Sequence, residues 1–186
     1  MKRLLDLIFC VAAAVLLALP LLLVALAVKL TSVGPVLFWA DRVGQSNRIF
    51  KMPKFRTMLA QTPVLATHLL ENPDSYLTAV GGFLRKSSLD ELPQLWSIFK
   101  GDMSFVGPRP ALFNQDDLVE LRTRHGVHAL VPGLTGWAQI NGRDELPIPQ
   151  KVALDLEYMR RQSLLFDFQI LFLTFIKVIR RDNVAH

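Results

Sequence analysis

The segment Phe83–Pro110, FLRKSSLDELPQLWSIFKGDMSFVGPRP, places two adjacent carboxylates, Asp90 and Glu91, at the start of an apolar stretch. The apolar residues of Leu92–Phe99 recur at helical spacing, which predicts an amphipathic helix. Pro93 is compatible with a helix that begins at Asp90 or Glu91, because the first amide hydrogens of a helix have no intrahelical partner. We therefore expect both carboxylates to lie among free backbone N–H groups, at the positive end of a helix, and to be ionised.

The cations around this pair indicate what it could do. Arg85 and Lys86 precede the two carboxylates, and a rigid turn that carries Arg109 follows them. An ionised carboxylate beside several cations can attack a phosphate or hold a metal ion against one. A structural interpretation stays open, because Ser88 and Glu91 also fit a capping box, although Pro93 would then stand where an amide hydrogen is needed.

Length and charge define the class of protein. The chain has 186 residues, enough for one domain with a core, and its formal net charge is +5. Residues 1–30 contribute +2 and residues 160–186 contribute +3, so the basic excess accompanies the apolar ends. This pattern favours an anionic membrane surface and argues against nucleic-acid binding, because no basic stripe alternates with aromatic residues. Cys10 is the single cysteine, which excludes an internal disulfide and fits a reducing, cytosol-facing location.

The apolar run Leu7–Val28 contains no charged residue and could cross a hydrocarbon core of about 30 Å. It could be a cleavable signal peptide, a spanning helix, or a helix that enters the bilayer and returns. Pro20 removes the hydrogen bond to the Leu16 carbonyl, so we expect a break in the helix there. Basic residues flank the run on both sides, which suits two cytoplasmic ends. We therefore favour the re-entrant interpretation.

The segments Val36–Arg42 and Arg48–Phe55 read as two strands of a hairpin. Lys54 and Arg56 are two residues apart and therefore share one side of the second strand, where they could bind phosphate or face lipid headgroups. Arg143 ends the glycine-rich segment Val131–Arg143 and could reach an anion.

The remaining segments are expected to be mostly helical. We predict a helix over Ala111–His128, with its charged residues, Arg122 among them, on a solvated face, and a short strand at Trp137–Ile140. Two amphipathic helices follow, over Ile148–Arg161 and Leu164–Arg181, the second capped by Ser163. The wide apolar face of Leu164–Arg181, with basic residues at one end, fits a helix that lies in a membrane interface. A core helix of a soluble domain is the alternative, and the N-terminal apolar run favours the membrane interpretation.

Together these segments resemble one family of bacterial enzymes. The motifs are an apolar helix with a central proline, KFRTM at 54–58, SLDELPQLWSIFKGDMSFVGPRP at 88–110, PGLTGWAQINGR at 132–143 and FLTFIKVIRR at 172–181. In this order they resemble the small monotopic phosphoglycosyl transferases, the bacterial sugar transferases that start glycan assembly on a polyprenol phosphate. The resemblance covers nearly the whole chain.

The resemblance implies an activity. It implies transfer of a sugar-1-phosphate from a UDP-sugar to undecaprenyl phosphate, with release of UMP and a requirement for Mg²⁺. Asp90 would be the nucleophile that forms a covalent phosphosugar intermediate, and Glu91 would help to hold the metal ion, with Asp90 also a candidate metal ligand. The chain departs from the family at the helix break, where Leu19-Pro20 replaces the usual Ser-Pro.

We therefore expect a mainly α fold with a short β-hairpin. Residues 1–31 would form a re-entrant membrane helix, and residues 32–186 a cytoplasmic catalytic domain with interfacial helices at about 148–181. The protein would lie on the cytoplasmic face of the bacterial inner membrane, in contact with phospholipids. It could form a homodimer. The candidate phosphate ligands are Lys54, Arg56, Arg85, Arg109 and Arg143. A membrane phosphohydrolase that uses an aspartyl-phosphate and a non-catalytic membrane scaffold are the alternatives.

Overall fold

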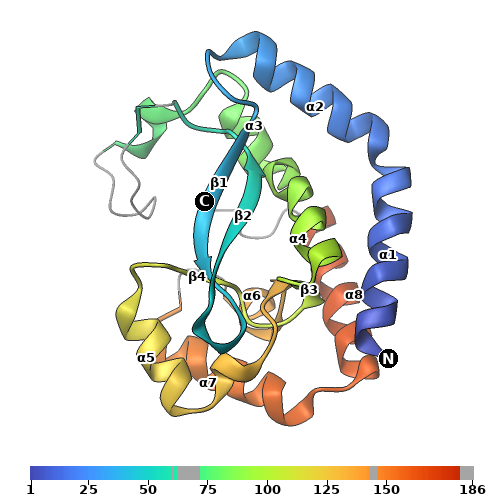
Figure 1. Ribbon diagram of the computed structural model, residues 1–186, viewed down its shortest axis with the longest axis vertical. Coiled ribbons are helices and arrows are strands. Elements are labelled where there is room, and N and C mark those ends of the chain that lie inside the picture. Colours follow the sequence, from blue (N-terminus) through green and yellow to red (C-terminus); the bar gives the residue numbers. More distant parts are fainter. Residues whose placement is uncertain (60, 63–71, 143–145, 181–186) are drawn as a thin grey trace.

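A computed structural model describes residues 1–59, 61–62, 72–142 and 146–180. The fold is mainly helical with a small sheet, as predicted (Figure 1). The elements, in order, are α1 Lys2–Leu16, α2 Ala18–Thr31, β1 Leu37–Val43, the 3₁₀ helix η1 Gln45–Asn47, β2 Ile49–Phe55, η3 Pro73–Tyr76, α3 Gly81–Lys86, η4 Leu89–Gln94, α4 Leu95–Lys100, β3 Ser104–Val106, β4 Ala111–Leu112, α5 Asp116–Arg124, η5 Val127–Ala129, β5 Gly133–Thr135, α6 Trp137–Ile140, α7 Ile148–Arg161 and α8 Leu164–Arg180.

The N-terminal helices α1 and α2 form an arc along one side of the molecule (Figure 1). They meet at Leu17 (φ −98°, ψ 7°) and are bent by 62°. Pro20 lies in the first turn of α2, where its missing amide hydrogen is not needed, and it removes the partner of the Leu16 carbonyl. The predicted break is confirmed, and it falls three residues before the proline. Among the described residues no single helix is long and apolar enough to cross a bilayer; α1 and α2 reach that criterion only together.

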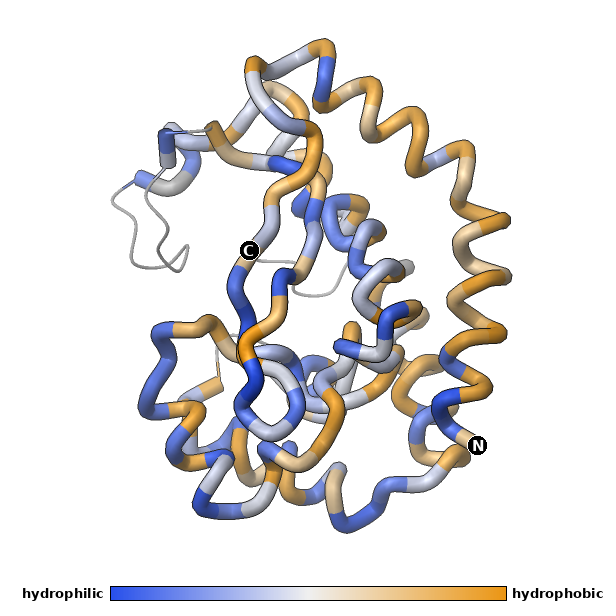
Figure 2. The backbone as a smooth tube through the Cα atoms, viewed as in Figure 1, coloured by the Kyte–Doolittle hydropathy of each residue, from blue (hydrophilic) through white to orange (hydrophobic). Residues whose placement is uncertain are grey.

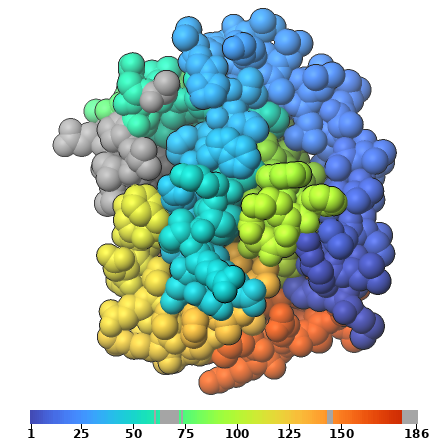
Figure 3. All heavy atoms as spheres, in the orientation of Figure 1, coloured from blue at the N-terminus to red at the C-terminus, as the bar shows by residue number. Residues whose placement is uncertain are grey.

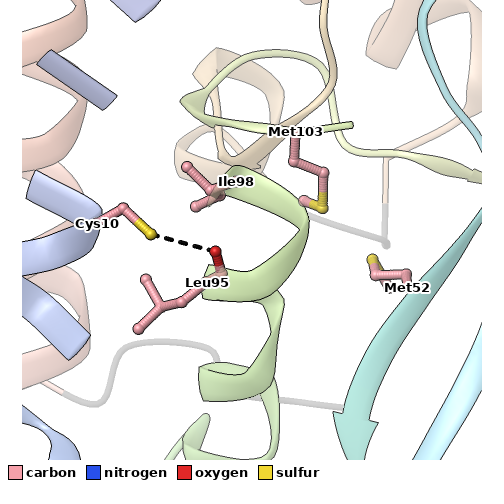
Figure 4. Packing of buried hydrophobic residues seen from close by; sticks show 5 residues of the cluster. All are labelled: Cys10, Met52, Leu95, Ile98 and Met103. Carbon is pink, nitrogen blue, oxygen red and sulfur yellow. Dashed lines mark hydrogen bonds between the residues drawn. The ribbon is translucent and has the colours of Figure 1, made fainter. Parts of the chain in front are cut away.

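Helix α1 is an integral part of the folded protein. Its Cys10 thiol donates to the Leu95 carbonyl (3.2 Å) and packs against α4 in a buried cluster with Met52, Ile98 and Met103 (Figure 4). The space-filling view shows α1 and α2 as one edge of the molecule, with side chains of α4 beside them (Figure 3). This packing argues against a cleavable signal peptide. It is compatible with a spanning helix and with a re-entrant helix, both of which stay attached to the domain.

The predicted hairpin is confirmed. Strands β1 and β2 pair antiparallel from Leu37 opposite Phe55 to Val43 opposite Ile49, and β4 adds to the other edge of β1. The connecting turn needs two left-handed residues, and Ser46 and Asn47 supply them. The hairpin runs through the centre of the molecule with α4 close to it (Figure 1), which brings β2 against η4.

A second, parallel pair of strands was not predicted. Strand β3 pairs with β5, with Val106 opposite Thr135. The predicted strand at Trp137–Ile140 is wrong, because that segment is helix α6 and the strand lies just before it. A Cβ at Gly133 would lie 2.1 Å from the Gly107 nitrogen. Glycine thus permits the close backbone approach that places β5 there.

The predicted helix over Ala111–His128 is only partly correct. Residues Ala111 and Leu112 are extended because they pair with β1, and α5 begins only at Asp116. Arg122 was expected on the solvated face of this helix and is instead buried, with 8% of its surface exposed. It shares the inward face with Leu118, four residues earlier.

Helices α7 and α8 match the prediction closely. The Phe166 amide donates to Ser163 Oγ (3.2 Å), so Ser163 caps α8 as predicted. Two polar residues of α8 point into the protein: Asp167 accepts from Lys2 (2.5 Å), and Thr174 bonds Thr135 (2.8 Å). Large apolar side chains of α8 face outward, and the exposed ones are Leu165, Phe168, Phe172, Phe175 and Val178.

Candidate active site

The carboxylate pair lies in a 3₁₀ helix rather than an α-helix. Helix η4 carries both residues, and α4 begins only at Leu95, after Pro93. Pro93 explains the change, because it cannot donate the hydrogen bond that would extend an α-helix through this turn. Ser88 precedes η4 with φ 56° and its side chain makes no capping hydrogen bond, so the capping-box interpretation is wrong.

Asp90 is a buried carboxylate with spare bonding capacity. Only 5% of the residue is exposed, and its buried Oδ1 has no hydrogen-bond partner in the described part of the chain. Burial raises the pKa of Asp90 to about 6, and the neighbouring Glu91 adds to this, while the charges of Lys54 and Arg85 oppose it. Asp90 is therefore mostly ionised at neutral pH, as expected, although burial outweighs the backbone hydrogen bond that favours the ionised form.

Glu91 is held by two cations. Lys54 Nζ (2.7 Å) and Arg109 Nη2 (3.1 Å) both donate to Glu91 Oε1. Burial alone would raise the pKa of Glu91, but the charges and hydrogen bonds of Lys54 and Arg109 hold it well below its usual range. The Glu91 carboxylate is thus held in place and charged, whereas the adjacent Asp90 carboxylate is buried and available to bind a ligand.

The structure distributes the other predicted cations differently. Arg85 Nε donates to Thr57 Oγ1 (3.0 Å), and its charge acts on Asp90. Arg56 is buried and donates to the Ser32 and Val33 carbonyls (3.0 and 2.6 Å), so its described contacts fasten the loop after α2. Arg143 lies outside the described residues.

A family comparison adds to this geometry. The model of the bacterial sugar transferase family matches residues 1–181 of the chain.

The chain belongs to the bacterial sugar transferase family.

Curated members of the bacterial sugar transferase family are similar over most of this chain. The undecaprenyl-phosphate glucose phosphotransferase of Komagataeibacter xylinus is 43% identical over 98% of this chain and 36% of its own length. The UDP-glucose:undecaprenyl-phosphate glucose-1-phosphate transferase of Escherichia coli is 42% identical over 95% and 40%. The exopolysaccharide production protein ExoY of Rhizobium meliloti is 41% identical over 87% and 78%. The chain thus spans well under half the length of the first two.

The side chains of the site can be compared with the ligands that a metal ion requires. No group of three or more histidine, cysteine, aspartate or glutamate side chains suited to a metal ion occurs among the described residues. Mg²⁺ needs fewer protein ligands, because it is usually held by one or two carboxylates with water and substrate phosphates. The orphaned Asp90 Oδ1 beside the Glu91 carboxylate fits that requirement.

Sequence reasoning missed two buried polar residues near the site. Arg122 in α5 donates through Nη1 to the Arg109 carbonyl (2.8 Å) and is itself paired with Asp155 of α7 (2.7 Å). The signal that could have revealed Arg122 was its position four residues after Leu118, on the apolar face of α5.

Proposed function

We propose that this protein transfers a sugar-1-phosphate from a UDP-sugar to undecaprenyl phosphate and releases UMP. The observation that carries the proposal is the buried Asp90 Oδ1, which has no partner among the residues that the structure describes, beside a glutamate that two cations hold ionised. Family membership and the names of the relatives support the same reaction. The first donor to test is UDP-glucose, because the Escherichia coli relative is named for it.

The chemistry requires two displacements at one phosphorus. In the first, an Asp90 carboxylate oxygen bonds to the sugar-bearing phosphorus, the phosphoanhydride bond breaks, and UMP leaves with its electron pair. In the second, a phosphate oxygen of undecaprenyl phosphate attacks the same phosphorus, and the Asp90 carboxylate is released. Lys54 and Arg109, which hold Glu91, are close enough to the site to offset part of the diphosphate charge.

Asp90 and Glu91 are the residues that would hold Mg²⁺. When bound, the ion would neutralise diphosphate charge as a Lewis acid. Glu91 keeps its negative charge for this purpose because Lys54 and Arg109 stabilise the ionised form.

The surface of the molecule supports a membrane location. The hydropathy view shows α1 and α2 as a nearly continuous apolar arc (Figure 2). Helix α8 has its polar Asp167 inside and Phe172 outside, with 63% of Phe172 exposed, which is the reverse of a water-facing helix. The exposed large apolar residues of the arc are Leu4, Ile8, Phe9, Val11, Val15, Leu16, Leu19, Leu22, Leu23, Leu26 and Leu30.

Both ends of the arc are fastened to the same domain, which supports a re-entrant helix on the cytoplasmic face. At the start, Lys2 donates to Asp167 and to the Val106 carbonyl (2.5 and 2.9 Å). At the end, Arg56 donates to the loop at Ser32. A straight spanning helix would carry one end across about 30 Å of hydrocarbon, away from these partners.

Intact-protein mass spectrometry tests the reaction. The purified protein is mixed with UDP-glucose and Mg²⁺ without lipid, quenched rapidly and weighed. We expect an added mass of one hexose phosphate, which is absent in Asp90→Asn, and parallel initial-rate plots when the lipid is supplied. Intersecting plots and no adduct would instead indicate direct transfer, with Asp90 as a metal ligand or base.

The same assay separates the two alternatives. A phosphohydrolase that uses an aspartyl-phosphate would release free sugar phosphate or inorganic phosphate without needing the lipid. A membrane scaffold would release no UMP, and Asp90→Asn would change nothing, because an amide also supports a helix start.

Cysteine labelling tests the topology. A single cysteine is either inserted directly after Met1 or substituted at Val33, where the exposed fractions of Met1 and Val33 are 95% and 96%, in a Cys10→Ala background. Both should be protected in intact cells from an impermeant reagent and should react after lysis. Labelling of one end alone in intact cells would establish a spanning helix.

A further inference from the structure

The turn that carries Arg109 is fastened through its backbone. Arg109 lies between Pro108 and Pro110, whose rings restrict the backbone of the whole turn. Each of the three successive carbonyls also accepts a hydrogen bond from a different element. The donors are the Gly133 amide of β5 to Pro108 (2.9 Å), Arg122 Nη1 of α5 to Arg109 (2.8 Å) and Arg42 Nη1 of β1 to Pro110 (3.3 Å).

Arg122 reaches this turn from a buried ion pair. Its Nε and Nη2 both donate to Asp155 Oδ2 (2.9 and 2.7 Å), while its Nη1 is directed to the Arg109 carbonyl. Only 8% of Arg122 and 1% of Asp155 are exposed. The planar guanidinium therefore links α7, through Asp155, to the backbone of the residue whose side chain contacts Glu91.

Stability does not explain this arrangement well. Removing two charges from water is costly, and an apolar pair of similar volume often serves a fold equally well. The pair instead directs a charge-assisted hydrogen bond to one carbonyl of the turn, and such bonds are short and directional. The Arg109 guanidinium lies 3.1 Å from Glu91 Oε1, so a displacement of its backbone would change that contact directly.

We propose that Arg122, held by Asp155, is a positioning residue that fixes the Arg109 turn so that the Arg109 side chain meets Glu91. The effect on catalysis rests on the proposed sugar-phosphate transfer, whereas the effect on the turn does not. Misplacement of a group that acts on the substrate site typically costs about 10- to 100-fold in rate.

The test replaces the ion pair without leaving a lone buried charge. Arg122→Met with Asp155→Leu substitutes apolar side chains of similar volume, which should keep the fold and the melting temperature close to those of the wild type. We expect kcat/KM for UDP-glucose to fall about 10- to 100-fold. The matched control is Arg124→Met on the same helix, an exposed arginine paired with Glu120, which should leave the rate unchanged.

A double-mutant cycle with Arg109→Ala separates positioning from general damage. If Arg122 acts through Arg109, the apolar pair should cause no further loss in the Arg109→Ala background. A loss of the same factor in both backgrounds, or full activity of the apolar pair, would overturn the proposal. Arg122→Lys keeps the charge opposite Asp155 and takes the place of the apolar pair if that variant does not fold.

Hydrogen exchange supplies a readout that needs no activity. In the apolar-pair variant, the peptide over residues 104–112 should exchange faster than in the wild type, while peptides of α1 and α4 stay unchanged. Unchanged exchange in 104–112 would overturn the positioning role. Faster exchange in a protein that releases no UMP from any UDP-sugar would uphold that role and refute the proposed function.

Discussion

Glu91 in η4 and Asp155 in α7 are both carboxylates bonded to cations, yet their pKa values move in opposite directions. Burial raises the pKa of Asp155, because Arg122, with a smaller effect of Lys151, does not fully offset it. Burial also acts on Glu91, but Lys54 and Arg109 together outweigh it and lower its pKa. The balance between burial and the cations that face a carboxylate therefore decides the direction of each shift.

The two regions also differ in how their bonding capacity is used. Arg122 donates to Asp155 and to one backbone carbonyl, so the bonding capacity of this ion pair is used within the fold. In the η4 region, the buried Asp90 Oδ1 has no hydrogen-bond partner within the described part of the chain, and it lies next to the charged Glu91. Unused capacity of that kind is costly in a fold, so it points to a ligand.

Asp90→Asn should abolish the covalent adduct and lower turnover by roughly 10⁶-fold, which is what loss of a nucleophile costs in another enzyme. It should not lower stability, because it removes a buried charge whose Oδ1 has no hydrogen-bond partner among the described residues. UMP release and thermal unfolding measure the two effects. An active variant would mean that Asp90 does not form the intermediate, and an unfolded one would mean that it is structural.

Arg122→Met alone should destabilise the protein by about 3–5 kcal/mol, because Asp155 is left buried without its partner. The measurement is the free energy of unfolding in detergent by urea titration. The second substitution, Asp155→Leu, should restore most of this loss. If the single variant is as stable as the wild type, Asp155 carries no uncompensated charge in that variant. The contrast between the Glu91 and Asp155 regions would then be wrong.

The stability difference between wild type and Asp90→Asn should depend on pH. The pKa of Asp90 in the folded protein is about 6, above its ordinary 3.8. The stability that its protonated form contributes is therefore complete below about pH 4 and is lost as the pH rises through 6. As the pH rises from about 4 to above 6, the free energy of unfolding of the wild type should fall by about 3 kcal/mol relative to that of Asp90→Asn.

Melting temperatures in EDTA between pH 4 and 7 test this prediction. Glu91→Gln is the matched comparison, followed from pH 7 down to about pH 3, and should show the opposite sign. The lowered pKa of Glu91 contributes stability that is complete above its ordinary pKa of 4.5 and is lost as the pH falls below that value. Parallel curves for wild type and Asp90→Asn would show that the Asp90 pKa is not raised.

Lys54→Met should have the smallest effect on stability, about 1–2 kcal/mol, because Arg109 still bonds Glu91 Oε1 in its absence. The pKa of Glu91 should rise towards its ordinary value, which can be followed by NMR of a labelled glutamate side chain. A loss as large as that of Arg122→Met would mean that Arg109 cannot hold the glutamate alone.

Local sequence determined most of the helices and the hairpin. Hydrophobic periodicity predicted α7 and α8 closely, and the hydroxyl of Ser163 predicted the start of α8. Pro20 predicted a break in the apolar run, since a proline in the interior of a helix removes a hydrogen bond and leaves the carbonyl four residues earlier without its partner. The paired carboxylates at Asp90 and Glu91 were found because both the residues and their cationic neighbours are adjacent in the chain.

Tertiary structure alone decided which cations meet which carboxylates. Lys54 reaches Glu91 across 37 residues and Arg122 reaches Asp155 across 33, whereas Arg56, two residues from Lys54, is bonded to the loop at Ser32. The burial that raises the pKa of Asp90 also arises only when distant elements pack around η4. Helical and strand periods depend on neighbours in the chain, but desolvation and ion pairing depend on what the fold brings together, so no local pattern could report them.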